Sequence, residues 1–86
     1  MTMTIRFSHD YSDIYPNDDG IKTYSISGNF NKTQVNSIIR FFVSDLTSRS
    51  LRKGEYDMVK RLVTEALDTG RSEAMEGCIV LEINKE

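Results

Sequence analysis

The chain has 86 residues, of which 38% are hydrophobic and 28% charged, and its formal net charge is −2. A chain of this length forms one domain with a thin core, and this composition is too apolar for a disordered chain. The longest apolar run, residues 78–81, is far shorter than the ~20 residues that span a bilayer, and the first ten residues lack the pattern of a secretory signal. We therefore predict a single soluble domain, residues 1–86, with no membrane partner.

The single cysteine and the distribution of charge indicate the cell compartment and the kinds of partner that suit the chain. Cys78 has no second cysteine with which to form a disulfide, which favours the reducing cytoplasm, and its apolar neighbours predict a buried, inert thiol. Residues 31–54 carry a net charge of +4, whereas residues 1–30 and 55–86 carry −2 and −4. The negative net charge of the whole chain disfavours non-specific nucleic-acid binding, but the basic segment of residues 31–54 could still contact an anion.

The N-terminal third has the pattern of a hairpin with a long connection. Residues 3–7 and 21–30 alternate apolar and polar, as half-buried strands do. Residues 9–20, which are rich in Asp and contain Pro16 and Gly20, predict a loop between them. In the second strand, Tyr24 and Ile26 share one face with Phe30, while the other face is polar.

Two amphipathic helices and a last strand follow. Asn31 and Gln34 have the spacing of a capping box before a first helix, and Gly70 is placed to end a second helix, which begins near Ser50 or Gly54. Residues 71–77 form either a connector or a further helical turn, and residues 78–84 form a strongly apolar strand. The order β-β-α-α-β predicts an α+β fold, a small three-stranded sheet with a helix pair packed on one face. The expected core consists of Ile5, Phe7, Tyr24, Ile26, Phe30, Val35, Ile38, Ile39, Phe42, Leu46, Val59, Leu62, Val63, Ala66, Ile79, Leu81 and Ile83.

The titratable residues, the possible metal ligands and the glycines do not form a recognisable catalytic or cofactor site. His9 is the only histidine, and we expect it to be a solvated loop residue because no nucleophile is placed to use it. The acidic loop supplies oxygen ligands but lacks calcium-loop spacing, since Ile26 stands where the final Glu would be needed. The glycines are isolated and form no phosphate-binding pattern. We predict no enzyme activity, no cofactor and no metal.

Two groups of residues are candidates for binding a partner protein. Phe41 and Met58 each fall about 120° from the centre of their helix's apolar stripe, so they either widen the buried face or point outward to contact another protein or a second copy of this chain. The acidic loop mixes carboxylates with aromatic side chains and is either a plain solvated turn or a surface for a basic partner. Its candidate contact residues are Tyr11, Asp13, Tyr15, Asp18 and Asp19.

The stretch from Lys22 to Leu67 supports an alternative of another class. Its order of strand, helix, short break and helix resembles the ribbon-helix-helix family of dimeric DNA-binding regulators. The resemblance implies that the strand's outward side chains read bases and that the start of the second helix holds phosphate. Carried over by position, the nucleic-acid-binding residues would be Thr23, Ser25, Ser27, Arg52 and Lys53. The short outward side chains and the extra strands on either side count against this alternative.

The expectation that best fits the whole sequence is a non-catalytic protein–protein interaction module. Ordinary folding signals, the absence of site chemistry and a few apolar residues outside the helical pattern lead to it. By analogy with small accessory or inhibitor proteins of phages and bacteria, which have sequences of this kind, we expect the chain to act by binding another macromolecule.

Overall fold

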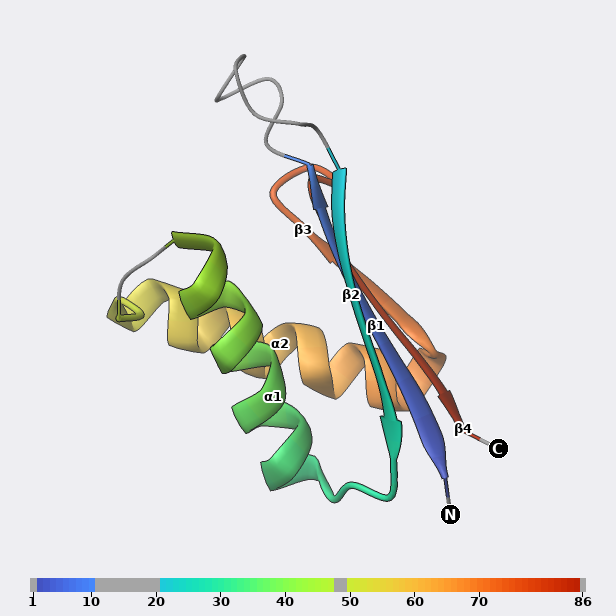
Figure 1. The fold of residues 1–86 in the computed structure, drawn as a ribbon. Helices are drawn as coiled ribbons and strands as arrows, with labels where there is room; N and C mark the ends of the chain where they lie inside the picture. Colours follow the sequence, from blue (N-terminus) through green and yellow to red (C-terminus); the bar gives the residue numbers. More distant parts are fainter. Residues whose placement is uncertain (1, 11–20, 48–49, 86) are drawn as a thin grey trace.

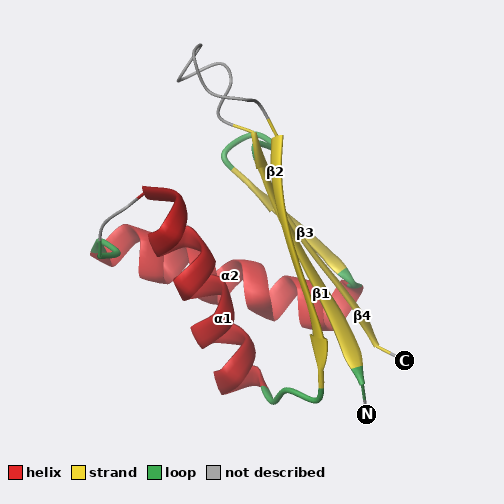
Figure 2. Ribbon diagram, viewed as in Figure 1, coloured by secondary structure: helices red, strands yellow, loops and turns green. Residues whose placement is uncertain are grey.

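The computed structural model describes residues 2–10, 21–47 and 50–85. In chain order these form β1 (Met3–Asp10), β2 (Ile21–Gly28), α1 (Lys32–Thr47), α2 (Lys53–Thr69), β3 (Arg71–Ala74) and β4 (Ile79–Lys85). The strands make one antiparallel sheet in the order β2-β1-β4-β3, and both helices lie on the same face of it (Figures 1 and 2). The predicted α+β class is confirmed, with four strands in the described sheet where three were expected.

The additional strand is β3, in the segment where we predicted a connector or a helical turn. Ser72 and Ala74 are buried while Arg71 and Glu73 are exposed, which is the alternation of a strand. The Ser72 hydroxyl donates to the carbonyl of Leu62 at 2.7 Å and so fixes β3 against α2. A four-residue strand with only two inward side chains gives too short a period-2 signal to be separated from a turn by pattern alone.

The first strand extends further than predicted, and this changes the position of His9. The alternation of β1 continues through His9, which pairs in register with Lys22 and Ile79. His9 therefore faces the helices and is 2% exposed, so the expectation of a solvated loop histidine is wrong. Cys78 lies in the turn before β4 and is only half-buried, which corrects the expectation of a buried thiol.

The helix boundaries follow the capping signals. Asn31 and Gln34 exchange reciprocal bonds of 2.8 and 2.9 Å between side chain and backbone, as the capping box predicted. The second helix begins at Lys53, where the Glu55 carboxylate accepts the backbone N–H of Arg52 at 3.0 Å. Gly70 ends this helix with φ +92°, the left-handed conformation that favours glycine.

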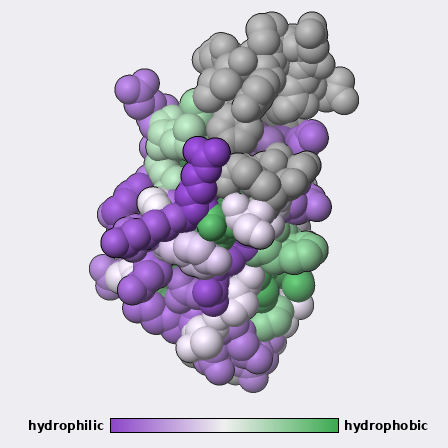
Figure 3. Space-filling view, turned by 90° about the vertical axis from the view of Figure 1, so that its left-hand side faces the viewer, coloured by the Kyte–Doolittle hydropathy of each residue, from purple (hydrophilic) through white to green (hydrophobic). Residues whose placement is uncertain are grey.

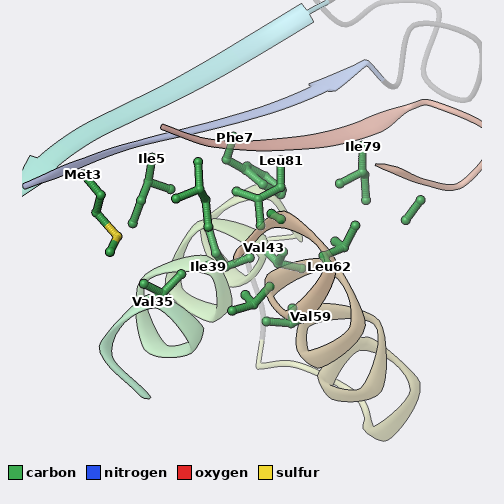
Figure 4. Packing of buried hydrophobic residues seen from close by; sticks show 14 residues of the cluster. Met3, Ile5, Phe7, Val35, Ile39, Val43, Val59, Leu62, Ile79 and Leu81 are labelled. Carbon is green, nitrogen blue, oxygen red and sulfur yellow. The ribbon is translucent and has the colours of Figure 1, made fainter. Parts of the chain in front are cut away.

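The core is one cluster between the helix pair and the sheet (Figure 4). Its fully buried side chains include Ile5 and Phe7 from the sheet and Ile39 from α1. The stripe of α1 is centred on Val35, Ile39 and Val43, so the core gains Val43, which was not among the expected core residues. It also gains Met3 and Ala74, which were not expected.

Several expected core residues lie at the margin instead. Tyr24, Phe30, Ile38 and Phe42 are half-buried against the cluster. Ile26 was expected in the core but is 37% exposed, because β2 is an edge strand that the helices cover only in part. The side chain of Leu46 lies outside the described residues.

Candidate functional site

Phe41 is the most exposed of the large hydrophobic side chains that the structure describes. It lies on α1 and is 68% exposed, which fits the outward-pointing one of the two alternatives that its position on the helical wheel left open. Its ring meets the neighbouring Phe42 ring edge to face, at a centroid distance of 6.3 Å. An exposed aromatic of this kind contributes little to the fold and is a common contact residue in protein interfaces.

A fixed arginine lies next to Phe41 along the same helix. Arg40 is half-buried, and its guanidinium donates to the Asn36 carbonyl at 3.3 Å and to the Ser37 hydroxyl at 3.2 Å. The same guanidinium lies over the Tyr56 ring of α2, 5.9 Å from its centroid. These contacts use only part of the five N–H donors of an arginine, so the side chain is held in place while donors remain for an anion.

Two adjoining hollows follow the groove between α1 and α2, with volumes of about 250 and 360 Å³. Both are lined by Arg40 and Tyr56. We call this the helix-pair groove; its other described lining residues are Thr33, Asn36, Ser37, Phe41, Ser44, Ser50, Leu51 and Lys60. Among these described residues two are cationic and none is acidic.

The helix-pair groove suits a partner's side chains better than a small-molecule substrate. Each hollow is at or below the small end of the range for drug-sized ligand pockets. The lining combines hydroxyl groups with the cations of Arg40 and Lys60 and the rings of Phe41 and Tyr56. Aromatic anchors beside an arginine are the usual composition of interface hot spots, and the cations match carboxylates. Figure 3, which views the molecule from the helix side, shows a mainly hydrophilic surface with limited hydrophobic areas.

Sequence reasoning found one member of this groove and missed the others. The helical wheel marked Phe41, but Arg40, Tyr56 and Lys60 meet only because α1 and α2 pack side by side. Tyr56 lies at the helical spacing of the apolar stripe of α2, with Val59 and Val63, yet it is 43% exposed.

The other predicted partner-binding residues do not join the groove in the described structure. Met58 is half-buried and packs against the core cluster, which fits the alternative in which it widens the buried face of α2. The candidates of the acidic loop lie outside the described residues: Tyr11, Asp13, Tyr15, Asp18 and Asp19.

The residues implied by the ribbon-helix-helix resemblance fall into two separate groups. Thr23, Ser25 and Ser27 are exposed on the sheet face that the helices leave open, as predicted. Arg52 and Lys53 are exposed at the start of α2, in the helix layer on the other side of the sheet (Figure 1). One copy of the chain therefore does not present both groups to the same ligand.

Comparisons with protein-family models, with curated proteins and with solved structures found no match to this chain. Neither α1 nor α2 is long and apolar enough to cross a membrane. In the described part of the chain, no group of three or more His, Cys, Asp or Glu residues is arranged to hold a metal ion.

Proposed function

We propose that this protein is a non-catalytic interaction module that binds an acidic segment of another protein in the helix-pair groove. The observation that carries the proposal is the exposed Phe41 ring beside the fixed guanidinium of Arg40. An apolar ring with a cation next to it fits a partner that offers a hydrophobic side chain flanked by Asp or Glu. Tyr56 and Lys60 extend the same chemistry along the groove.

The first test changes the aromatic anchor. Phe41→Ser should weaken binding of the partner at least tenfold, because truncating a hot-spot residue costs about 2 kcal/mol or more. The free energy of unfolding should change little, since the ring is mostly exposed. The measurement is a pull-down of the tagged protein from cell lysate after nuclease treatment, followed by titration calorimetry with the partner that is recovered.

Met75→Ser is the matched control, because Met75 is an exposed hydrophobic residue in the β3–β4 turn, outside the groove. This variant should bind like the wild type. Equal binding by wild type and Phe41→Ser would remove the groove from the interface. Loss of all recovered protein on nuclease treatment would instead favour the ribbon-helix-helix-like alternative.

A second test addresses the charge of the partner. Lys60→Glu places an acid in a lining that otherwise has none among its described residues, so we expect several-fold weaker binding and a smaller dependence on salt. Lys32→Glu changes charge by the same amount at an exposed position that is not among the described lining residues, and it should have little effect. Equal weakening by both substitutions would indicate only long-range charge attraction.

A further inference from the structure

The two outer strands of the sheet differ in how their free edges are treated. The order β2-β1-β4-β3 places β2 at one edge and β3 at the other. No described strand pairs with the outer edge of β2. A free edge presents backbone N–H and C=O groups that can pair with another chain, so proteins commonly block it.

The edge formed by β3 is blocked in several ways. This strand has only four residues, and its Arg71 and Glu73 side chains form an ion pair at 2.6 Å. The Arg71 carbonyl accepts the Thr69 hydroxyl at 2.8 Å, and the Glu73 carbonyl accepts Nη2 of Arg61 at 3.2 Å. Short length, charge and side-chain bonds to the outer carbonyls leave little here for another strand to pair with.

The register of the sheet identifies the backbone groups at the β2 edge. The N–H of Ile83 donates to the Gly70 carbonyl at 3.0 Å, so the odd-numbered residues of β4 direct their backbone groups toward β3. In an antiparallel strand, successive residues direct their backbone N–H and C=O groups to opposite neighbours. The even-numbered residues of β4 therefore bond to the even-numbered residues of β1. The odd-numbered residues of β1 in turn bond to the even-numbered residues of β2. It follows that Thr23, Ser25 and Ser27 direct their backbone N–H and C=O groups outward.

Among the described residues, the β2 edge carries one of these protections, a single charged side chain, and not the others. Strand β2 has eight residues and no proline, and Lys22 is its only charged residue. Thr23, Ser25 and Ser27 are exposed, and Ile26 is exposed on the helix side of the same strand. A long, nearly uncharged edge with an exposed isoleucine favours pairing with a further strand.

We propose that this edge pairs antiparallel with β2 of a second copy of the chain, giving a two-fold dimer with one continuous sheet. The register centred on Ser25 uses all three outward residues, with Ser25 opposite Ser25 and Thr23 opposite Ser27 of the second copy. Each of these pairs exchanges two backbone hydrogen bonds. The same pairing continues the hydroxyl contacts that β2 already makes with β1, Thr4–Ser27 at 3.0 Å and Ser8–Thr23 at 3.4 Å.

The charge and side-chain pattern of β2 is self-complementary in this register, which is why the occupant is a second copy. Lys22 falls opposite Gly28, so no like charges meet across the new pair. On the helix face Tyr24 falls opposite Ile26, an aromatic side chain against a β-branched one. The apolar surface continues beside the strand, because the Phe42 ring stacks on Tyr24 at 4.8 Å and the Phe30 ring packs over Gly28. Figure 3 shows hydrophobic surface along the margin on the side of α1 and β2.

Sedimentation velocity from micromolar to millimolar concentration tests the dimer directly. The wild-type chain should dimerise, and Ser25→Pro should weaken the dimer by about 10- to 100-fold, because it removes an outward N–H from each copy. Ser25→Ala keeps that N–H and should remain dimeric. The far-UV circular dichroism of both variants should match the wild type, because the lost N–H takes no part in the β1–β2 ladder. A wild-type chain that stays monomeric throughout overturns the proposal, as does equal dimerisation by both variants.

Cross-linking tests the register and does not depend on the folding of the proline variant. In a Cys78→Ser background, Ser25→Cys should oxidise to a disulfide-linked dimer, because the two cysteines face each other at the two-fold axis within disulfide range. Ser27→Cys is the matched control and should stay reduced, because Thr23 of the second copy lies opposite. A cross-link through Ser27→Cys alone, or through neither variant, contradicts the proposed pairing. Phe41→Ser should leave the dimer intact, which separates this test from that of the helix-pair groove.

Discussion

At the scale of single residues, Tyr24 ties the edge strand β2 to α1. Its hydroxyl donates to Oδ2 of Asp45 at 3.1 Å, and its ring forms a triangle with the rings of Phe42, at 4.8 Å, and Phe7, at 6.3 Å. Burial raises the pKa of Tyr24, and the hydrogen bond to Asp45 and the charge of that carboxylate raise it further. Losing the proton would remove the donor and leave two negative oxygens close together.

The raised pKa makes part of the stability dependent on alkaline pH. The contribution of protonated Tyr24 is fully present below its ordinary pKa of about 10 and is lost as the pH rises through the higher folded-state pKa. Tyr24→Phe should cost about 1 kcal/mol at neutral pH and should flatten the decline of stability above pH ~10. Urea unfolding at a series of pH values measures both effects.

Tyr56→Phe provides the control at neutral pH, because no described hydrogen bond involves the exposed Tyr56 hydroxyl. It should stay within about 0.5 kcal/mol of the wild type. If Tyr24→Phe and the wild type declined in parallel at alkaline pH, the Tyr24–Asp45 bond would not be the cause of the decline.

At the scale of elements, the sequence correctly predicts the helices and strands whose local sequence signals agree with their packing in the fold. The first helix has a capping box and six apolar positions at helical spacing, and β1 and β2 alternate clearly. Strand β3 was missed because it depends on tertiary contacts, namely pairing with β4 and the Ser72 bond to Leu62 in α2. The burial of His9 was missed for a related reason, since polar residues next to an Asp-rich segment outweighed two more residues of alternation.

The helix-pair groove also shows that sequence patterns do not reveal features that depend on tertiary contacts. Phe41 could be found from one helix alone, because its angle to the apolar stripe depends only on sequence spacing. The pairing of Arg40 with Tyr56 depends on how α1 and α2 are placed against each other, and sixteen residues separate the two in sequence. The free edge of β2 likewise required the strand order, which periodicity does not contain.

Two glycines, one at each end of α2, allow a test of how the helix is ended. Gly70 has φ +92°, its N–H donates to the Ala66 carbonyl at 2.8 Å, and its own carbonyl accepts the N–H of Ile83. Gly70→Ala has room for the added carbon, 3.8 Å from the nearest oxygen, so the strain of the left-handed backbone alone should cost about 1–2 kcal/mol. Thermal unfolding followed by circular dichroism measures the loss.

Gly54→Ala is the matched substitution, because Gly54 lies in the first turn of the same helix without a positive φ, and its added carbon would meet nothing within 4 Å. It should stabilise the protein by up to about 0.5–1 kcal/mol, through higher helix propensity and a less flexible unfolded chain. Destabilisation of the same size at both positions would show that the cap conformation does not set the cost.

At the scale of the whole molecule, one cluster holds the fold together. Among the side chains that the structure describes, buried residues of both helices and of β1, β3 and β4 belong to it, whereas β2 contributes the partly buried Tyr24. The chain places one apolar layer between the helix pair and the sheet and leaves the other sheet face polar, with exposed Arg6, Thr23, Ser25 and Ser27. Its two candidate binding surfaces, the helix-pair groove and the β2 edge, therefore lie outside the residues that determine folding.

A single shared cluster predicts that helices and sheet unfold together. Leu62 is fully buried on α2, and the backbone of the same residue anchors β3 through Ser72. Leu62→Ala should destabilise the protein by about 2–5 kcal/mol, a large fraction of the stability expected for so small a domain. Helical circular dichroism and tyrosine fluorescence should shift together and keep coincident transitions in wild type and variant. Two of the four tyrosines are described, Tyr24 at the sheet and Tyr56 in the helix layer, so the fluorescence includes a signal from the sheet that helical circular dichroism does not follow. Separate transitions for the two probes would instead mean that the helix pair and the sheet are stable independently, and that the shared cluster contributes less than its burial implies.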